Sequence, residues 1–522
     1  MSRSARAAKG FAASMLQYCT QILLQIVLAP LVLKLAGRET LGAYAAISQT
    51  LSLLALVDIA GSWSLERFLG QARGIEDGGE RFRRVFTTSR TISFLSNLIF
   101  ALLVVIFSFW IAPLFHLGDL VATGARRALY VIAMWSVVRT PLIAYENALI
   151  ATQDLVATSF ISALVGILRA VASLVFVLCG AGLFGLMLSG TIAGAVGSIL
   201  YRTRFRRLHA NLVPRWGIPD RPLLREMLGF SFHSAFLNVG NMLFFTSGNM
   251  LAGLTNGAAA ASTYYTTQMP TTTIYTMINR LTDSATPAIN ELFGAGELER
   301  LRKVFLRLVR LLLLMAMPLS IGVLLFNRDV VTTWVGEQQF AGKLMTISLA
   351  IYCVTLGIQN LAILFAFVFG WVRLLSLTAL LQGVANFGLA FYLGKRLGVG
   401  GVTLALVLVL LPQLVVLLIK IDRYLHIQSA LFIAQCLLQS AFPLAAASAL
   451  GYMVHGHVQI AYRHYASLAA ELSMFAAVYS ALAWRFQLAD EDRSDARRYA
   501  QRIYHRLRSI TGRSNTSPGE AS

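Results

Sequence analysis

Residues 91–113, TISFLSNLIFALLVVIFSFWIAP, form a long apolar segment without a charged side chain. A helix needs roughly 20 such residues to cross a hydrocarbon layer about 30 Å thick, and this segment is long enough. Comparable segments recur along the whole 522-residue chain. We therefore predict an all-α polytopic membrane protein with about 14 transmembrane helices.

The predicted spans have ends that are defined to within a few residues. Several of them exceed the length of a perpendicular crossing, so tilted or protruding helices are expected. The spans are 11–33, 41–69, 91–113, 125–152, 158–178, 182–201, 227–254, 260–287, 304–326, 344–370, 372–394, 399–421, 429–454 and 465–486.

The composition agrees with a membrane protein. Hydrophobic residues make up 57% of the chain and charged residues 13%, whereas a soluble globular protein carries about 25% charged residues. The net charge of +20 would suggest nucleic acid in a soluble chain, but here the basic residues lie mainly in short connections between apolar spans. Such residues fix membrane topology, so no nucleic-acid partner is expected.

The basic residues also orient the chain. With the N-terminus placed in the cytoplasm, 29 of the 44 Lys and Arg residues fall on the cytoplasmic side, nine on the opposite side and six within spans. This asymmetry follows the positive-inside rule and predicts that both termini are cytoplasmic. The N-terminal MSRSARAAKG leads into a long first span without a small-residue cleavage site, which favours an uncleaved helix over a signal peptide.

The sequence contains an internal repeat. GGERFRRVF at 78–86 and ELERLRKVF at 297–305 share five of nine residues at an offset of 219. This repeat predicts two parallel six-helix lobes followed by two further helices, an arrangement in which a transporter holds its substrate between the repeats. The predicted parts are the N-terminal lobe 1–201, a cytoplasmic linker 202–226, the C-terminal lobe 227–421, two added helices within 429–486 and a basic cytoplasmic tail 487–522.

Charged residues within spans are the first candidates for function, because each is costly in a membrane unless it is paired or hydrated. Arg139 and Arg169 lie halfway along the fourth and fifth spans, near the membrane midplane. They are candidates for a cationic cavity, since guanidinium groups hold phosphate through several donors. The alternative is a structural ion pair, such as Arg169 with Glu146, and Glu146 is also a candidate for ion coupling.

The second and eighth spans carry further charged residues. Arg67 lies near the cytoplasmic end of its span, and Asp58 lies deeper and has no partner on its own helix. Arg280 and Asp283 are three residues apart, so they can pair on one helix. We assign Arg67 and Arg280 to the cationic cavity, and Asp58 and Asp283 to ion coupling; structural pairing or hydrogen bonding is the alternative for each.

Polar residues without charge mark two other spans. Gln17, Gln21 and Gln25 form one stripe on the first span, at spacings of four residues, and Asn241 lies on the seventh. A helix surface that faces lipid would not carry them. They are expected either to line a polar cavity or to form hydrogen bonds between helices.

The motifs of common enzymes are missing from the sequence. It contains no Walker A motif, so the chain is not expected to hydrolyse ATP by itself, and it has no nucleophile elbow or zinc-binding HExxH motif. The four cysteines, Cys19, Cys179, Cys353 and Cys436, lie far apart in apolar segments and are expected to be small core residues. We therefore predict a protein that is not an enzyme and has no cofactor or metal, with coupling to a proton or sodium gradient as a candidate energy source.

Three segments together resemble a known family. They are KGFAAS leading to LAPLVLKLAGRETLGAYAAI at 9–47, ALIATQDLVATSFISALVGI at 148–167, and the passage from GAGELERLRKVF to WVG at 294–336. The chain resembles, over roughly residues 8–420, the polysaccharide-transporter branch of the multidrug/oligosaccharidyl-lipid/polysaccharide (MOP) exporters, the Wzx-like flippases. The resemblance rests on the order and spacing of these segments, because the family shares no strict catalytic motif.

The resemblance implies a flippase in the bacterial inner membrane with two lobes arranged as a V. It would move polyprenyl-diphosphate-linked oligosaccharide repeat units by alternating access, for the export of O-antigen, capsule or exopolysaccharide. Its partners would be the lipid-linked glycan, membrane lipids and other polysaccharide-assembly membrane proteins. The alternatives within the fold are a multidrug efflux transporter and a lipid II flippase; a polytopic polysaccharide polymerase or ligase is the alternative from another class.

Overall fold

The computed structural model describes residues 3–73, 77–213, 219–457, 464–488, 492–494 and 498. Helices dominate this part of the chain, and it contains no β-strand. The helices are α1 (Arg3–Leu54), η1 (Ala55–Asp58), α2 (Ile59–Arg73), α3 (Glu80–Phe115), α4 (Asp119–Val138), α5 (Thr140–Ala151), α6 (Leu155–Leu178), α7 (Gly182–Leu208), η2 (Ala210–Leu212), α8 (Arg221–Phe245), α9 (Gly248–Asn256), α10 (Ala258–Gly294), α11 (Leu298–Val335), η3 (Glu337–Gln339), α12 (Lys343–Val368), α13 (Val372–Leu397), α14 (Val399–Leu425), α15 (Ser429–His457) and α16 (His464–Phe486).

Ten helices of the described chain are long and apolar enough to cross a membrane, or eleven if the bent pair α4 and α5 forms one span. Their outer surfaces remain apolar, as on α3, where Leu95, Leu102 and Phe109 are about 60% exposed. This surface fits a lipid environment and not water. The all-α membrane fold is thus confirmed, while the count of fourteen spans stays a prediction.

Three predicted spans are interrupted. The second is divided by the 3₁₀ turn η1, and the seventh consists of α8 and α9, which are separated at Thr246 and Ser247. The fourth, predicted as one helix over 125–152, is bent by 66° between α4 and α5. These interruptions matter for function, because irregular backbone at membrane depth is tolerated where it lies within protein or beside a polar cavity.

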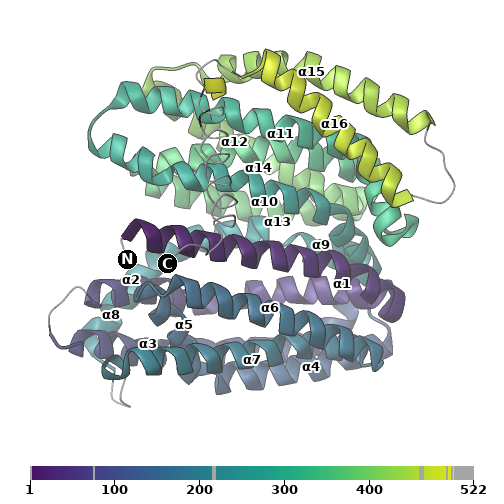
Figure 1. Cartoon of the computed structure of the whole chain (residues 1–522). Coiled ribbons are helices and arrows are strands. Elements are labelled where there is room, and N and C mark those ends of the chain that lie inside the picture. The colour runs from purple at the N-terminus through teal and green to yellow at the C-terminus, as the bar shows by residue number, and fades with distance from the viewer. Residues whose placement is uncertain are drawn as a thin grey trace, which may run out of the picture.

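The helices form two lobes (Figure 1). Helices α1–α7 make up the lower half of that view and α10–α16 the upper half, with α1 between the two halves. Helix α8 joins the lobes, because it packs against α2 at one side and against α13 at the other. The two related segments of the internal repeat lie at the start of α3 in the first half and at the start of α11 in the second.

The lobes share one core at one end of the bundle and have separate cores at the other. The shared core includes Ala46 of α1, Phe115 of α3, Leu251 of α9 and Met345 of α12. Toward the other end, one cluster is built around Phe86 and Tyr145, and another is built around Phe305 and Phe365. We call the joined end, which holds the connections at 116–118, 179–181 and 398, the closed end.

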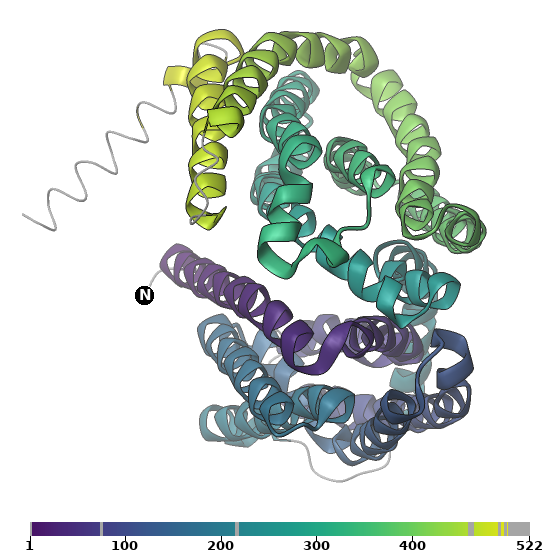
Figure 2. The same cartoon turned by 90° about the vertical axis from the view of Figure 1, so that its right-hand side faces the viewer.

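At the closed end, the first lobe contacts the second through α1. Gly37 divides α1 with a positive φ of 86°, which glycine adopts without a steric penalty, and so separates the predicted first and second spans. Just beyond it, Gly42 lies against the α10 backbone so closely that a Cβ there would be 1.7 Å from the Ala258 carbonyl oxygen. Figure 2 shows α1 running between the two halves.

The added helices α15 and α16 pack on α11, at the outside of the second lobe (Figure 2). Beyond α16, the carboxylate of Asp492 is 5% exposed and accepts a 2.6 Å hydrogen bond from Arg307 Nε of α11, with Arg310 3.9 Å away. This part of the tail is therefore held by the second lobe through an ion pair whose carboxylate is buried and whose arginines are partly exposed.

Candidate functional site

Two adjoining cavities lie within and beside the first lobe. Cavity A has a volume of about 420 Å³, and cavity B has a volume of about 340 Å³. Tyr44, Ser48, Arg169 and Leu186 line both of them. Cavity A reaches the second lobe at Asn249 and Tyr265, so it lies between the lobes, where a substrate of a two-lobe transporter is expected.

Arg169 stands between the two cavities. Its guanidinium donates a hydrogen bond to the hydroxyl of Tyr44 and lies 5.9 Å from the centre of that ring. The Arg169 side chain remains exposed to the cavities. The alternative prediction was an ion pair between Arg169 and Glu146. In the structure, Arg169 bonds to Tyr44 of α1 instead, and Glu146 lies beside Tyr201.

Arg139 lies at the bend between α4 and α5 and lines cavity B together with Arg169. The bend follows from the sequence Arg139-Thr140-Pro141: proline has no N–H to donate to the carbonyl of Val137, and its ring clashes with that carbonyl. The proline therefore begins a new helix and leaves Arg139 at the break. The two arginines that were singled out by their depth are thus brought together at one cavity.

Among the other predicted site residues, Gln25 lines cavity A. Arg67 and Glu146 are exposed on α2 and α5, and Asn241 is half-buried on α8; none of these three is among the residues lining either cavity. The remaining residues have side chains that lie outside the described part of the structure: Gln17, Gln21, Asp58, Arg280 and Asp283.

Several residues of the cavities had not been singled out from the sequence. Cavity A also includes Gln49 and Tyr265, and cavity B includes Trp135 and Thr191. Gln49 sits within the second predicted span, and its polar side chain in an apolar segment was the available signal. Uncharged aromatic residues give no comparable signal, because most of them in a membrane helix face lipid or the core.

The second lobe also contains a buried amide cluster that was not predicted from the sequence. Gln359 of α12 donates to Gln382 of α13 at 3.2 Å and to Gln413 of α14, and Gln413 donates to Thr378 at 2.9 Å. All three glutamines are buried. Because buried amides are costly without partners, this cluster fixes the mutual rotation of three helices of the second lobe.

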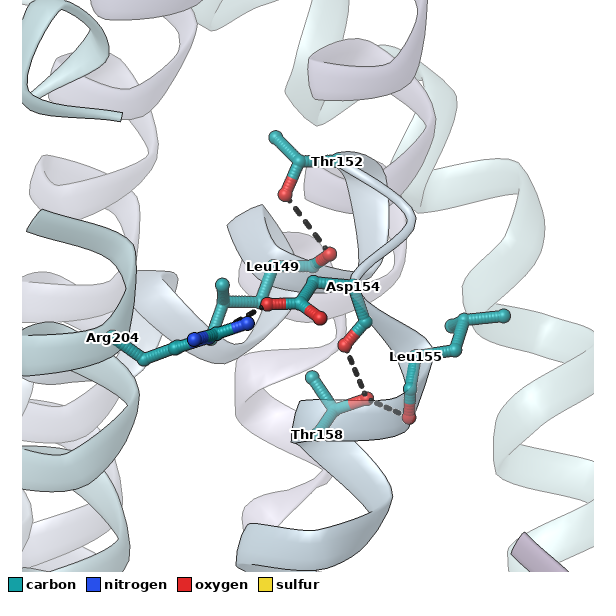
Figure 3. A network of polar contacts seen from close by, with 6 residues as sticks. All are labelled: Leu149, Thr152, Asp154, Leu155, Thr158 and Arg204. Carbon is teal, nitrogen blue, oxygen red and sulfur yellow. Dashed lines mark hydrogen bonds and ion pairs between the residues drawn. The ribbon is translucent and has the colours of Figure 1, made fainter. Parts of the chain in front are cut away.

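A polar network closes the turn between α5 and α6 (Figure 3). Arg204 of α7 donates a 2.9 Å hydrogen bond to the carboxylate of Asp154, while Thr152 and Thr158 bond to backbone carbonyls of the same turn. Gln153 has a positive φ of 63°. The network anchors the far end of the bent span, and with it α5, to α7.

Beside this network lies His209, which follows α7. Burial, with help from the nearby cation Arg73, lowers the pKa of the His209 imidazole below its usual value of 6.5. His209 also contacts the ring of Phe205 at 5.3 Å between ring centres. Burial and the nearby cation favour the neutral imidazole.

Within the described residues, no group of three His, Cys, Asp or Glu side chains could hold a metal ion. All four cysteines are free. Cys353 and Cys436 are buried as predicted, but Cys19 and Cys179 are exposed, so the prediction of core positions is wrong for these two. An apolar stretch of sequence does not distinguish a helix face that packs on protein from one that meets lipid.

Comparison with known proteins identifies the family. Residues 32–341 match the family model described as polysaccharide biosynthesis protein. None of the curated proteins matches the chain significantly.

Solved structures share the fold at low sequence identity. The lipid II flippase MurJ in an inward closed conformation superposes with a TM-score of 0.66 and 13% identity, over 91% of this chain and 97% of that chain. An inward-facing multidrug resistance MATE family transporter of the MOP superfamily gives a TM-score of 0.62 and 15% identity, over 80% and 98%. A MOP superfamily transporter from Pyrococcus furiosus gives 0.56 and 14%, over 81% and 95%.

The family match covers more than half of the chain, and the structural likeness covers most of it. The resemblance inferred from the sequence is thereby confirmed. The chain belongs to the polysaccharide biosynthesis protein family and is a multi-pass membrane protein with the MOP-superfamily fold.

Proposed function

We propose that this protein is a flippase that translocates polyprenyl-diphosphate-linked oligosaccharide repeat units across the bacterial inner membrane for polysaccharide export. The observation that carries the proposal is the pair Arg139 and Arg169 on one cavity at the centre of the first lobe. The family to which the chain belongs supports it, and so does its shared fold with a protein named as a lipid II flippase.

The charge of the cavities favours an anionic cargo. Two permanently charged guanidiniums beside hydroxyl and amide groups can hold the oxygens of a diphosphate through several hydrogen bonds. Ser48, Gln25 and Gln49 offer partners for the hydroxyls of a glycan in cavity A. A cationic drug would be repelled by the same arginines, so the cavity supports multidrug efflux less well.

The proposed transport step follows from this arrangement. The head group enters the polar space between the lobes while the polyprenyl chain stays in the bilayer, where it costs no transfer of apolar surface into water. The lobes then rock about their contacts, which exposes the head group on the other side. Arg139 and Arg169 hold the diphosphate, and neither makes or breaks a covalent bond.

Arg67 and Arg280 remain proposed as further cationic contacts to the head group, and Gln17, Gln21 and Asn241 as polar groups along its path. Asp58, Glu146 and Asp283 remain proposed for coupling to a proton or sodium gradient. We also propose cytoplasmic N- and C-termini, on the basis of the basic connections. Transport that keeps its pH and sodium dependence after Asp58→Asn, Glu146→Gln and Asp283→Asn would exclude these carboxylates from coupling.

The test is complementation of a deletion strain with Arg139→Ala and Arg169→Ala, scored as polysaccharide at the cell surface. Both variants are expected to lose export at unchanged protein levels in the membrane. Arg373→Ala, an exposed arginine at the start of α13, is the matched control and is expected to export normally. Normal export by both cavity variants would contradict the proposal. If the deletion strain itself keeps normal surface polysaccharide, the flippase proposal is weakened and multidrug efflux becomes the favoured function.

A further inference from the structure

Helix α9 is capped by a residue of the other lobe. The first N–H groups of a helix need acceptors from outside the helix, and the residue before it normally supplies one. Ser247 precedes α9, but its hydroxyl donates to the Leu243 carbonyl at 2.5 Å and caps nothing. Instead, Gln49 Oε1 of α1 accepts from the backbone N–H of Asn249 at 2.6 Å and of Met250 at 3.1 Å.

The cap therefore exists only while the lobes are together. Gln49 lies on α1 of the first lobe, whereas α9 packs on α10 and α13 of the second lobe. If the lobes part there, the two N–H groups lose their acceptor. Both Gln49 and Asn249 line cavity A with Arg169, so these N–H groups would then face the space in which the head group is proposed to lie.

Asn249 itself gives an independent sign of a ligand. Its side chain is 7% exposed, and its Oδ1 is buried without a hydrogen-bond partner among the described residues. A buried carbonyl oxygen without a donor is costly, and it can accept hydrogen bonds from a hydroxyl group. This oxygen belongs to the residue whose N–H is capped, so the two N–H groups would suit phosphate oxygens and Oδ1 would suit the hydroxyl of an adjoining sugar.

We propose that the N-terminus of α9 is a second anion-binding subsite, which Gln49 fills in the present state and a phosphate of the head group takes when the lobes separate at the closed end. The inference rests on the proposed function, because it specifies how the same cavity handles its diphosphate. Helix N-termini stabilise anions through their free N–H groups and dipole. Cargo and Gln49 then compete for one site, which couples opening of the closed end to the presence of cargo.

The binding test uses inorganic pyrophosphate and the purified full-length protein in nanodiscs. Gln49→Glu places a fixed carboxylate at the subsite and is expected to weaken pyrophosphate binding by about tenfold. Gln49→Ala removes the competitor and is expected to strengthen binding a few-fold. Gln428→Glu makes the same chemical change in an exposed turn between α14 and α15 and is expected to bind like the wild type.

Gln49→Glu and Gln49→Ala are thus expected to change pyrophosphate affinity in opposite directions. A change that only destabilised the protein would weaken binding in both variants, so the two results distinguish this role from a structural one. A second readout is the distance between spin labels at Leu120 and Leu397, near the closed end of the two lobes, with the exposed Cys19 and Cys179 replaced by serine. Pyrophosphate is expected to lengthen this distance in the wild type and not in Gln49→Glu.

Equal effects of the two Gln49 variants, or no pyrophosphate binding by either the wild type or Gln49→Ala, would overturn the subsite. The proposed function is judged separately, by Arg139→Ala and Arg169→Ala in the complementation assay. Loss of export in those variants together with unchanged binding in Gln49→Glu would reject the subsite and leave the flippase proposal standing.

Discussion

The indole nitrogen of Trp334 on α11 donates a 2.8 Å hydrogen bond to the backbone carbonyl of Ile26 on α1. Within a helix, that carbonyl would accept from the N–H four residues later, but residue 30 is proline and has no N–H. A side chain from the second lobe thus satisfies a carbonyl that Pro30 leaves free in the first. Pro30 therefore creates the acceptor for this contact between the lobes, whereas the interruption of α1 lies farther along, at Gly37.

This relationship predicts a dependence of one substitution on the other. Trp334→Phe should destabilise the protein by about 1 kcal/mol, the usual net value of a hydrogen bond. In a Pro30→Ala background the same change should cost less, because the introduced alanine supplies the missing N–H. Thermal unfolding of the two single variants and the double variant measures the coupling. Trp110→Phe, at a 63% exposed tryptophan on α3, is the control, and additive effects of the two changes would contradict the interpretation.

Substitution of Gly42 should force the lobes apart at the closed end. A Cβ there would lie 1.7 Å from the Ala258 carbonyl oxygen, so the two helix backbones must move. We expect Gly42→Ala to cost about 1–3 kcal/mol of stability, as in overpacked cores, and to lengthen the distance between spin labels at Leu120 and Leu397. Gly388→Ala on α13, where a Cβ meets open space, should change neither value. An unchanged distance in Gly42→Ala would show that α1 and α10 adjust without separating.

The bend that places Arg139 should be essential for export. Pro141→Ala restores the N–H at that position and favours a straighter helix, which turns Arg139 away from cavity B. Displacement of a binding group by an ångström is enough to lower export by about tenfold or more. Surface polysaccharide is measured at matched protein levels. Pro222→Ala in the first turn of α8, where the missing N–H has no helical acceptor, should export normally.

Two of the carboxylates that pair with arginine, Asp492 and Asp154, should differ in their contribution to stability. Asp492 is 5% exposed, and its partners Arg307 and Arg310 are 43% and 33% exposed, so Asp492→Asn removes a buried, doubly paired carboxylate and should cost about 1.5 kcal/mol or more. Asp154 is 20% exposed and its partner Arg204 is 45% exposed, so Asp154→Asn should cost less than about 1 kcal/mol. Thermal unfolding of both variants tests the order, and a larger loss in Asp154→Asn would reverse the assignment.

Stability should fall at mildly acidic pH in part through His209. Its pKa in the folded protein lies below the usual 6.5, so the unfolded chain binds the proton more readily. The contribution of the neutral imidazole is therefore complete above about pH 6.5 and is lost as the pH falls from there through the folded-state pKa. The unfolding temperature of His209→Gln should decline less between pH 7 and pH 5 than that of the wild type. Parallel declines would exclude His209 as a contributor.

The sequence by itself determined the class of protein and the depth of its charges. Apolar length is a local property, so the membrane fold could be predicted, as could the helices that carry Arg139 and Arg169. Those two arginines and Gln25 do line cavities, as their positions in apolar spans indicated. The fourth span was predicted as one helix, although Pro141 in the sequence Arg139-Thr140-Pro141 was already a signal for the bend.

Only the tertiary structure decided which residues meet. The partner of Arg169 is Tyr44, 125 positions away, and the cap of α9 is Gln49, about 200 positions away. The depth of a residue in a span does not tell which way its helix is rotated or which helices lie next to it. Both depend on packing between segments that are far apart in the sequence. The same limit explains why Arg67 and Asn241, polar residues in predicted spans, lie outside the cavities, whereas the uncharged Tyr44 and Tyr265 line them.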